Sequence, residues 1–204
     1  MKKLILMMMA FSSLSIANDD GIPSKKERKF VTKYMESSMD QLFNGIEDLN
    51  EAQWNFTPAD GGWSVAGTCE HLLIAERGFY NLIEGRILTS EDNRAQPDEL
   101  TSNEAVIEFI KDRSPSKRVK TPAPFEPTGA VKSPADFMEK YKVARQKLMD
   151  YIKTTEKELK SYYWESPAGK ISAYQWLILA SAHTERHFAQ MQETMAEAGY
   201  PKVD

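Results

Sequence analysis

The sequence has few of the features that cross-link a small protein or hold it in a membrane. Cys69 is the only cysteine among 204 residues, so no disulfide forms within the chain and packing must stabilise the fold. After the first residues, no apolar run approaches the roughly 20 residues of a membrane-spanning helix. The length suits one domain of ordinary size with its own core.

Clustered basic charge is also scarce. The chain has 26 lysine and arginine residues against 30 acidic ones, and its short basic runs at residues 25–29 and 111–120 are interpreted as solvated surface. Proteins that bind nucleic acids gain affinity by neutralising phosphates with clustered basic side chains. The composition therefore predicts no nucleic-acid partner.

The first 17 residues, MKKLILMMMAFSSLSIA, have the pattern of a secretory signal peptide: two lysines, an apolar run and a Ser-x-Ala pair before an expected cut after Ala17. An uncleaved anchor is the alternative, but the run is too short to span a bilayer. We expect an exported protein, periplasmic or secreted, with a signal peptide at 1–17, one domain at 18–204 and no stable membrane insertion after cleavage. Cleavage would remove Lys2 and Lys3 and change the formal charge from −4 to −6.

Four segments carry apolar residues at the three- and four-residue spacing of one helix face. Ser64 and Ser133 stand where the N-caps of two of these helices are expected, and Gly199 followed by Pro201 is typical of a helix end. The predicted helices cover residues 24–50, 65–88, 133–160 and 172–199.

The stretch at 89–132 is rich in proline, which excludes a long helix and removes backbone donors from any sheet. We expect a long crossover there, with a short helix at 103–113. The segment SYYWESPAGK, residues 161–170, is expected to be a loop, and no strand is predicted. The pattern predicts an all-α protein, a four-helix bundle with a long crossover connection between its second and third helices.

The segment HTERH, near the end of the chain, contains two of the three histidines. His183 and His187 are four residues apart, so they share one face of the last predicted helix. The same line passes through Trp176, Ala180 and Met191. It therefore predicts that both rings point into the bundle rather than toward the charged face.

His71, the third histidine, lies in line with uncharged residues, and two of them, Ala75 and Gly78, are small enough to leave room beside its ring. Imidazoles from two helices would form a three-nitrogen metal site with open coordination positions. The alternative is that each histidine is an ordinary core or boundary residue with its own hydrogen bond, because an i, i+4 pair alone is a weak motif. Three histidines on apolar lines make the metal site as strong a hypothesis as the ordinary core residues, and the spacing alone leaves both open.

The residues around the histidines add no further ligand. HTERH is not the metalloprotease motif H-E-x-x-H, because its glutamate points to the opposite side of the helix. Cys69 lies roughly 200° around the helix from His71 and is expected to be a small buried hydrophobe. Glu70 and Glu76 are displaced from the line of His71 and are expected to be surface charges.

Three segments resemble the DinB-like (DinB/YfiT) superfamily. GGWSVAGTCEHLLIAERGFYNLI is similar to its W-S-x-x-x-x-x-x-H segment, HTERHFAQMQE to its H-x-x-x-H helix, and LNEAQWNFTPADGGWS to the stretch before the W-S pair. The resemblance implies a four-helix bundle in which His71, His183 and His187 bind a divalent metal ion such as nickel or zinc, with Trp63 and Ser64 as structural positions. It also implies a homodimer, because relatives often dimerise.

The resemblance further implies metal-dependent chemistry. Some relatives are thiol transferases or isomerases that use a low-molecular-weight thiol, but such thiols are chiefly cytoplasmic and the export signal departs from that role. An open three-histidine site can lower the pKa of a bound water or thiol. We therefore expect a metal-dependent hydrolase or transferase acting on a small molecule, with catalytic residues that the sequence does not identify.

Two other functions stay open at this point. One is a non-catalytic metal- or ligand-binding helical bundle, and the other is a metal-free helical interaction module. Gln190 and Tyr141 are candidates to support the site from outside the ligand set. If a metal is bound, an ordinary histidine pKa of roughly 6.5 predicts its release below about pH 6.

Overall fold

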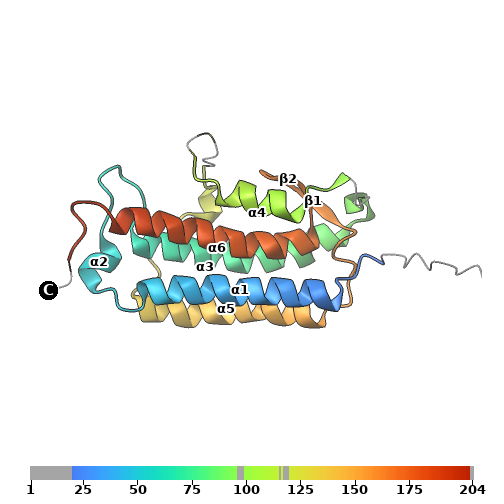
Figure 1. Cartoon of the computed structure of the whole chain (residues 1–204), viewed down its shortest axis with the longest axis horizontal. Coiled ribbons are helices and arrows are strands. Elements are labelled where there is room, and N and C mark those ends of the chain that lie inside the picture. The colour runs from blue at the N-terminus through green and yellow to red at the C-terminus, as the bar shows by residue number, and fades with distance from the viewer. Residues whose placement is uncertain (1–19, 96–98, 115, 117–119, 203–204) are drawn as a thin grey trace, which may run out of the picture.

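The computed structural model describes residues 20–95, 99–114, 116 and 120–202, so the predicted signal peptide lies outside the described residues. Long helices dominate it (Figure 1), as the sequence pattern predicts. They are α1 (Lys25–Ile46), α3 (Val65–Gly85), α5 (Pro134–Thr154) and α6 (Ala173–Met195).

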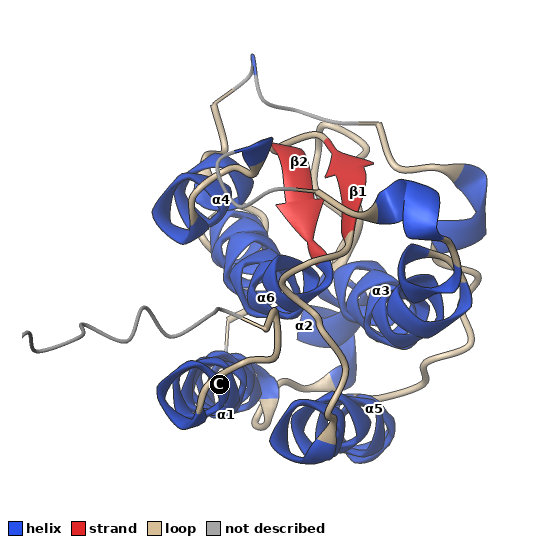
Figure 2. Cartoon of the chain, turned by 90° about the vertical axis from the view of Figure 1, so that its right-hand side faces the viewer, coloured by secondary structure: helices blue, strands red, loops and turns tan. Residues whose placement is uncertain are grey.

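The four long helices form a ring of neighbours in the order α1, α5, α3 and α6, seen end-on in Figure 2. The colours of Figure 1 show α1 and α6 running one way and α3 and α5 the other. Phe79 of α3 packs beside Trp176 near the start of α6, whereas His71, earlier in α3, meets His187 further along α6. The antiparallel pair α3 and α6 therefore brings together the two histidine-bearing segments.

Serine hydroxyls cap the four long helices at their N-terminal ends. The hydroxyl of Ser64 accepts a bond from the backbone N–H of Gly67, and that of Ser133 accepts one from Asp136. Ser24 and Ser172 make the same bond at the starts of α1 and α6. Each bond satisfies one backbone donor that the helix leaves free, so the predicted helix starts are confirmed.

The helix ends differ from the predictions. The first predicted helix, 24–50, ends at Ile46, and a separate short helix α2 (Glu51–Asn55) follows because Asn50 caps it. The spacing of apolar residues could not show this break, since apolar residues continue through it. The third predicted helix, 133–160, ends at Thr154, where the chain becomes extended at Thr155.

The second and fourth predicted helices are also shorter than expected. α3 ends at Gly85, and a single 3₁₀ turn, η1 (Ile87–Thr89), continues the chain in place of the predicted last turn. α6 ends at Met195, four residues before the glycine that the prediction took as its end. The last turn of a helix frays easily, and apolar spacing does not locate its final residue.

A short antiparallel hairpin replaces the predicted loop at 161–170. Its strands are β1 (Tyr163–Ser166) and β2 (Gly169–Ser172), and Gly169 supplies the positive φ of 98° that the turn requires. Strands of four residues are too short to show a clear alternation of apolar and polar residues. The prediction of no strand is therefore wrong, although the fold remains all-α in its main body.

The long crossover between α3 and α5 follows the prediction. It contains η2 (Glu91–Asn93), the short helix α4 (Asn103–Lys111) and η5 (Ala123–Phe125). α4 packs against α6, and both views place α4 and the hairpin on the same side of the bundle, away from α1 and α5 (Figures 1 and 2). This side therefore carries an additional layer of chain over α3 and α6.

The core consists of buried apolar side chains along the bundle. One cluster lies toward the hairpin and another toward α2, with Leu148 and Trp54 as respective members. Among the described residues, no helix combines the length and apolarity needed to cross a membrane.

Candidate metal centre

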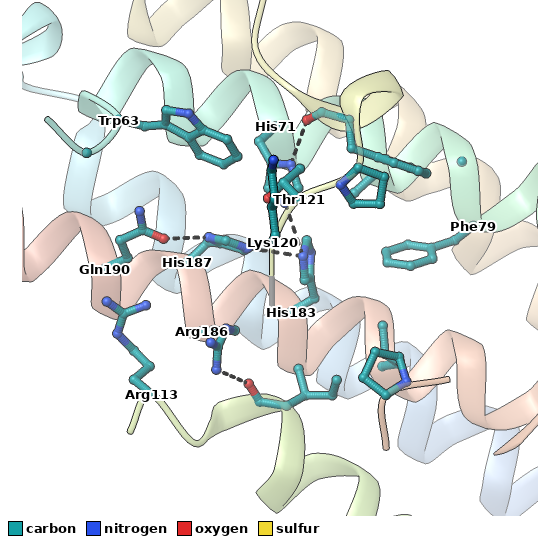
Figure 3. Close-up of a pocket in the computed structure, with 18 of the residues that line it drawn as sticks. Trp63, His71, Phe79, Arg113, Lys120, Thr121, His183, Arg186, His187 and Gln190 are labelled. Atoms are coloured by element: carbon teal, nitrogen blue, oxygen red, sulfur yellow. Dashed lines mark hydrogen bonds between the residues drawn. The ribbon is translucent and has the colours of Figure 1, made fainter. Parts of the chain in front are cut away.

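The structure brings the three predicted histidines together. His71 lies on the second turn of α3, and His183 and His187 lie one turn apart on α6. The Nε2 atom of His183 is 3.3 Å from Nε2 of His71 and 3.1 Å from Nε2 of His187. One ligand atom from each residue lies within 4.8 Å of the other two, and Figure 3 shows the rings converging from the two helices.

Hydrogen bonds fix the orientation of two of the rings. The Nδ1 atom of His71 donates to the carbonyl oxygen of Phe125 at 2.8 Å, and that of His187 donates to Oε1 of Gln190 at 2.9 Å. A neutral imidazole with its proton on Nδ1 carries a lone pair on Nε2. Both rings therefore turn an unprotonated nitrogen toward the third histidine, which is the state that a metal ligand needs.

Burial keeps the three imidazoles neutral. It lowers the pKa of His183 well below the ordinary histidine value, and the neighbouring His187 and His71 lower it further. Burial lowers the pKa of His187 to about 3 and also lowers that of His71, although the bond to Phe125 opposes the shift at His71. Neutral imidazole is the ligating form, so acid release of a bound ion is expected at a lower pH than ordinary histidines predict.

Aromatic rings flank the histidines on both sides. The ring of Trp63 has its centroid 5.0 Å from that of His71, and the ring of Phe79 stands at 90° to His183 with centroids 5.8 Å apart. Figure 3 places Trp63 and Phe79 on opposite sides of the three rings. These contacts restrict the rotation of the imidazoles and reduce the access of water to them.

The crossover loop that supplies the Phe125 carbonyl is anchored to α3 by Glu70. Its carboxylate accepts bonds from the backbone N–H groups of Thr128, Gly129 and Ala130 and from the Thr128 hydroxyl. Glu70 is only 4% exposed, so the prediction of a surface charge is wrong here. The carboxylate is stable when buried because its oxygens are fully used by these donors.

Glu76 is also buried and lies behind the site rather than on the surface. Its Oε1 is 2.9 Å from Nε of Arg145 on α5, and both side chains are almost inaccessible to solvent. Arg145 also bonds to Tyr141 and to Thr184, the neighbour of His183. The position of Glu76 around its own helix could not reveal this ion pair, because the partner lies on a distant segment.

The two residues proposed to support the site, Gln190 and Tyr141, differ in their contacts. Gln190 bonds directly to one of the three histidines, His187. Tyr141 instead bonds to Thr184 and Glu76 within the buried network. Cys69 is fully buried 3.9 Å from the sulfur of Met191, which agrees with its predicted role as a small hydrophobe.

The histidines line a cavity of about 810 Å³. Its described lining comes from α3, α6, α4, the crossover, the hairpin and the loop at 58–63, and none of it comes from α1 or α5. The rings therefore face the groove under the crossover rather than the centre of the bundle, which corrects the predicted direction. Apolar lines on α6 do not distinguish these two directions, because the crossover buries the outer groove as well.

Some parts of the site had no detectable sequence signature. The ligand-orienting group of Phe125 is a backbone carbonyl, which carries no residue-type information. Trp164 of β1 lines the cavity only because of a hairpin that was not predicted. Lys120 and Thr121 join the same lining through the path of the crossover (Figure 3). These contributions depend on tertiary structure.

The fold and the site together define a four-helix bundle with a three-histidine cluster between two antiparallel helices. The sequence profile of the DinB superfamily matches residues 34–191, and the chain belongs to that superfamily. The structure of YfiT from Bacillus subtilis, described as "a probable metal-dependent hydrolase with an unusual four-helix bundle topology", has a similar fold. The TM-score is 0.56 and the identity 18%, over 88% of this chain and 91% of YfiT. Among curated proteins, none has significant sequence similarity to the chain.

Proposed function

We propose that this protein binds a divalent metal ion, such as nickel or zinc, through His71, His183 and His187 and acts as a metal-dependent hydrolase or transferase on a small molecule. The observation that carries the proposal is the convergence of three imidazole nitrogens within 4.8 Å at the wall of a cavity of about 810 Å³. Three nitrogen ligands with open positions are typical of catalytic rather than structural metal sites. The description of YfiT as a metal-dependent hydrolase supports the same chemistry.

The residues around the site have distinct tasks in this proposal. A divalent ion in such a shell supplies Lewis-acid chemistry, which polarises a bound oxygen or sulfur group. Phe125 and Gln190 hold the two Nδ1 protons, so that Nε2 of His71 and His187 stays available for ligation. Trp63 and Phe79 exclude water from the sides of the rings, and the cavity leaves space for a substrate.

Metal analysis of protein without a histidine tag tests the proposal first. We expect about one divalent ion per chain in the original protein and strong loss in His71→Ala and His187→Ala. Asn81→Ala, at an exposed position of the same helix as His71, serves as the control and should retain the metal. Absence of stoichiometric metal after loading with nickel, zinc, cobalt or manganese would disprove the metal site.

Turnover separates an enzyme from a non-catalytic binding protein. The metal-loaded protein is assayed against panels of small esters, amides and lactones, and against electrophiles with a small thiol as co-substrate. We expect activity that disappears with the metal and in His187→Ala. Stoichiometric metal without turnover of any panel member would favour the non-catalytic bundle.

We also propose that the protein is exported and acts outside the cytoplasm. The support is the sequence of residues 1–17, which has the pattern of a cleavable signal peptide. Fractionation of expressing bacteria should find the protein in the periplasm or medium, with Asn18 as its first residue. A cytoplasmic protein that keeps residues 1–17 would contradict this proposal.

Light scattering of the purified protein tests the expected homodimer.

A further inference from the structure

The cavity extends well beyond the space that three metal ligands need. From His71 its lining continues along α3 through Ala75, Gly78 and Leu82, at steps of three or four residues. The rise of about 1.5 Å per helical residue makes this path roughly 16 Å long. On α6 the lining extends in the same direction from His183 to Leu179 and Trp176. The cavity is therefore a groove between the two helices that leads from the histidines toward the hairpin.

The two ends of this groove differ in chemistry. Toward the hairpin, five side chains line it with aromatic and aliphatic surface, which we call the apolar arm: Phe79, Leu82, Trp164, Trp176 and Leu179. On the other side of the histidines the lining is mostly polar and includes Gln190, Glu193, Thr194 and Glu197. Arg86 and Glu165 also line the cavity toward the hairpin. An apolar group placed in the arm would remove apolar surface from water.

The apolar arm is in direct contact with the histidines. The ring of Phe79 lies 6.0 Å from the ring of Trp176 and 5.8 Å from the ring of His183, measured between centroids. Phe79 and Trp176 are only 8% and 9% exposed, and Leu82 and Trp164 are half-buried. A ligand that occupies the arm would therefore have its near end at the histidines.

The hairpin holds the far wall of the arm in place. Trp164 of β1 pairs with Ile171 of β2, which is fully buried in the core. The guanidinium group of Arg86 lies 5.3 Å from the centre of the Trp164 ring and so covers one side of it. These contacts form the wall without a ligand, and a preformed wall lowers the entropy cost of binding.

We propose that the apolar arm binds an aromatic or similarly bulky apolar group of the substrate, so that the group to be transformed lies at the three histidines. The chemistry at the histidines rests on the proposed metal-dependent function. The binding of the apolar group does not depend on it. It defines the substrate class as small molecules with an aryl or branched acyl portion joined to a metal-binding polar group. Compact, fully polar molecules would leave the arm empty and should bind weakly.

The chain provides its own reporters for a test without metal. Trp164 and Trp176 lie in the arm, Trp63 lies beside His71, and Trp54 is buried in the cluster toward α2. The metal-free protein is titrated with 3-phenylpropan-1-ol, a neutral and non-chelating aryl compound, while the indole N–H signals are followed by NMR. We expect saturable shifts at Trp164 and Trp176 and no change at Trp54. Non-saturable shifts, or equal shifts at all four indoles, would overturn the proposal.

A charge in the arm should weaken this binding. Leu82→Glu places a carboxylate there, four residues before Arg86, a spacing that favours the helix. Val143→Glu is the matched control, because Val143 is 70% exposed on α5, which contributes nothing to the described cavity lining. We expect at least tenfold weaker binding of 3-phenylpropan-1-ol to Leu82→Glu and unchanged binding to Val143→Glu. Equal binding to Leu82→Glu and the original protein would overturn the proposal. Circular dichroism verifies that both variants are folded.

Chelating probes separate this inference from the proposed function. On the zinc-loaded protein, 3-phenylpropanohydroxamate should bind about tenfold or more tightly than acetohydroxamate. Leu82→Glu should remove that difference, whereas Val143→Glu should retain it. If none of nickel, zinc, cobalt and manganese binds, the metal proposal fails and the alcohol titration still decides the apolar arm. If zinc binds and the two hydroxamates have equal affinity, only the apolar arm is wrong.

Discussion

Nδ1 of His187 donates a hydrogen bond to Oε1 of Gln190, 2.9 Å away and three residues further along α6. The bond fixes which ring nitrogen carries the proton and leaves Nε2 free to ligate. Partners of this kind contribute roughly 10–100-fold to metal affinity in other sites. We expect Gln190→Leu to weaken zinc binding by about this factor, measured by competition with a chromophoric chelator.

Gln190→Glu is the informative control for that prediction, because its carboxylate still accepts the Nδ1 proton. Its affinity should stay close to that of the original protein or exceed it. Thermal unfolding of the metal-free variants should show little change, since Gln190 is only half-buried. Equal zinc affinity of Gln190→Leu and the original protein would mean that the ring is held by packing alone.

Glu70 should influence the metal site without touching it. Burial acts to raise the pKa of its carboxyl, but the bonds from Thr128 and its neighbours hold that pKa below the ordinary value. The same bonds anchor the loop that follows Phe125. We expect Glu70→Gln to destabilise the fold by about 2 kcal/mol and to weaken zinc binding through His71.

Hydrogen exchange provides the local measurement for Glu70. The amides of Gly129 and Ala130 donate to the carboxylate, so they should exchange faster in Glu70→Gln. Glu126→Gln, at an exposed position of the same crossover, should alter neither exchange nor zinc affinity. Faster exchange with unchanged zinc affinity would show that the loop does not control the orientation of His71.

Local sequence rules predicted the helices and the histidine cluster. Helix starts depend on a serine and the few residues after it, so Ser64 and Ser133 could be recognised directly. The i, i+4 spacing of His183 and His187 fixes their common face. The inclusion of His71 in the same site was implied by the family resemblance more than by the spacing, and the antiparallel contact of α3 and α6 brings it there.

The features that the sequence did not predict depend on partners far along the chain. Glu70 and Glu76 were expected at the surface because each lies off the line of His71. They are buried because Thr128 and Arg145 supply donors from other segments. The hairpin was missed because each strand has only four residues and because β2 packs against α6, a contact that the local sequence does not show. No periodicity within one helix contains this information.

The ion pair between Glu76 and Arg145 should be costly to break from one side. Arg145 is fully buried, so Arg145→Met leaves a carboxylate without its charge partner. Removal of one member of a buried pair costs about 3–5 kcal/mol, whereas replacement of both by apolar residues is often neutral. We expect urea unfolding to show a loss of that size for Arg145→Met and substantial recovery in Glu76→Leu/Arg145→Met. If Arg145→Met were as stable as the original protein, the ion pair would not carry the expected cost.

The metal-free protein should lose stability as the pH falls below the pKa of an ordinary histidine. Burial lowers the pKa of His187 to about 3, while an unfolded histidine titrates near 6.5. Between these values the unfolded state binds more protons than the folded state, so the free energy of unfolding decreases as pH falls. The maximum slope is about 1.4 kcal/mol per pH unit for each such histidine.

Urea unfolding of the protein in a chelating buffer, from pH 7.5 to 4.5, measures that slope. Carboxylates such as Glu70 contribute in the lower part of this range, since the folded-state pKa of Glu70 is depressed and its stabilisation is lost on acidification. The difference between the original protein and His187→Asn isolates the histidine, because both share the carboxylates. We expect a shallower slope for His187→Asn between pH 7 and 5, and equal slopes would show that His187 titrates normally in the folded protein.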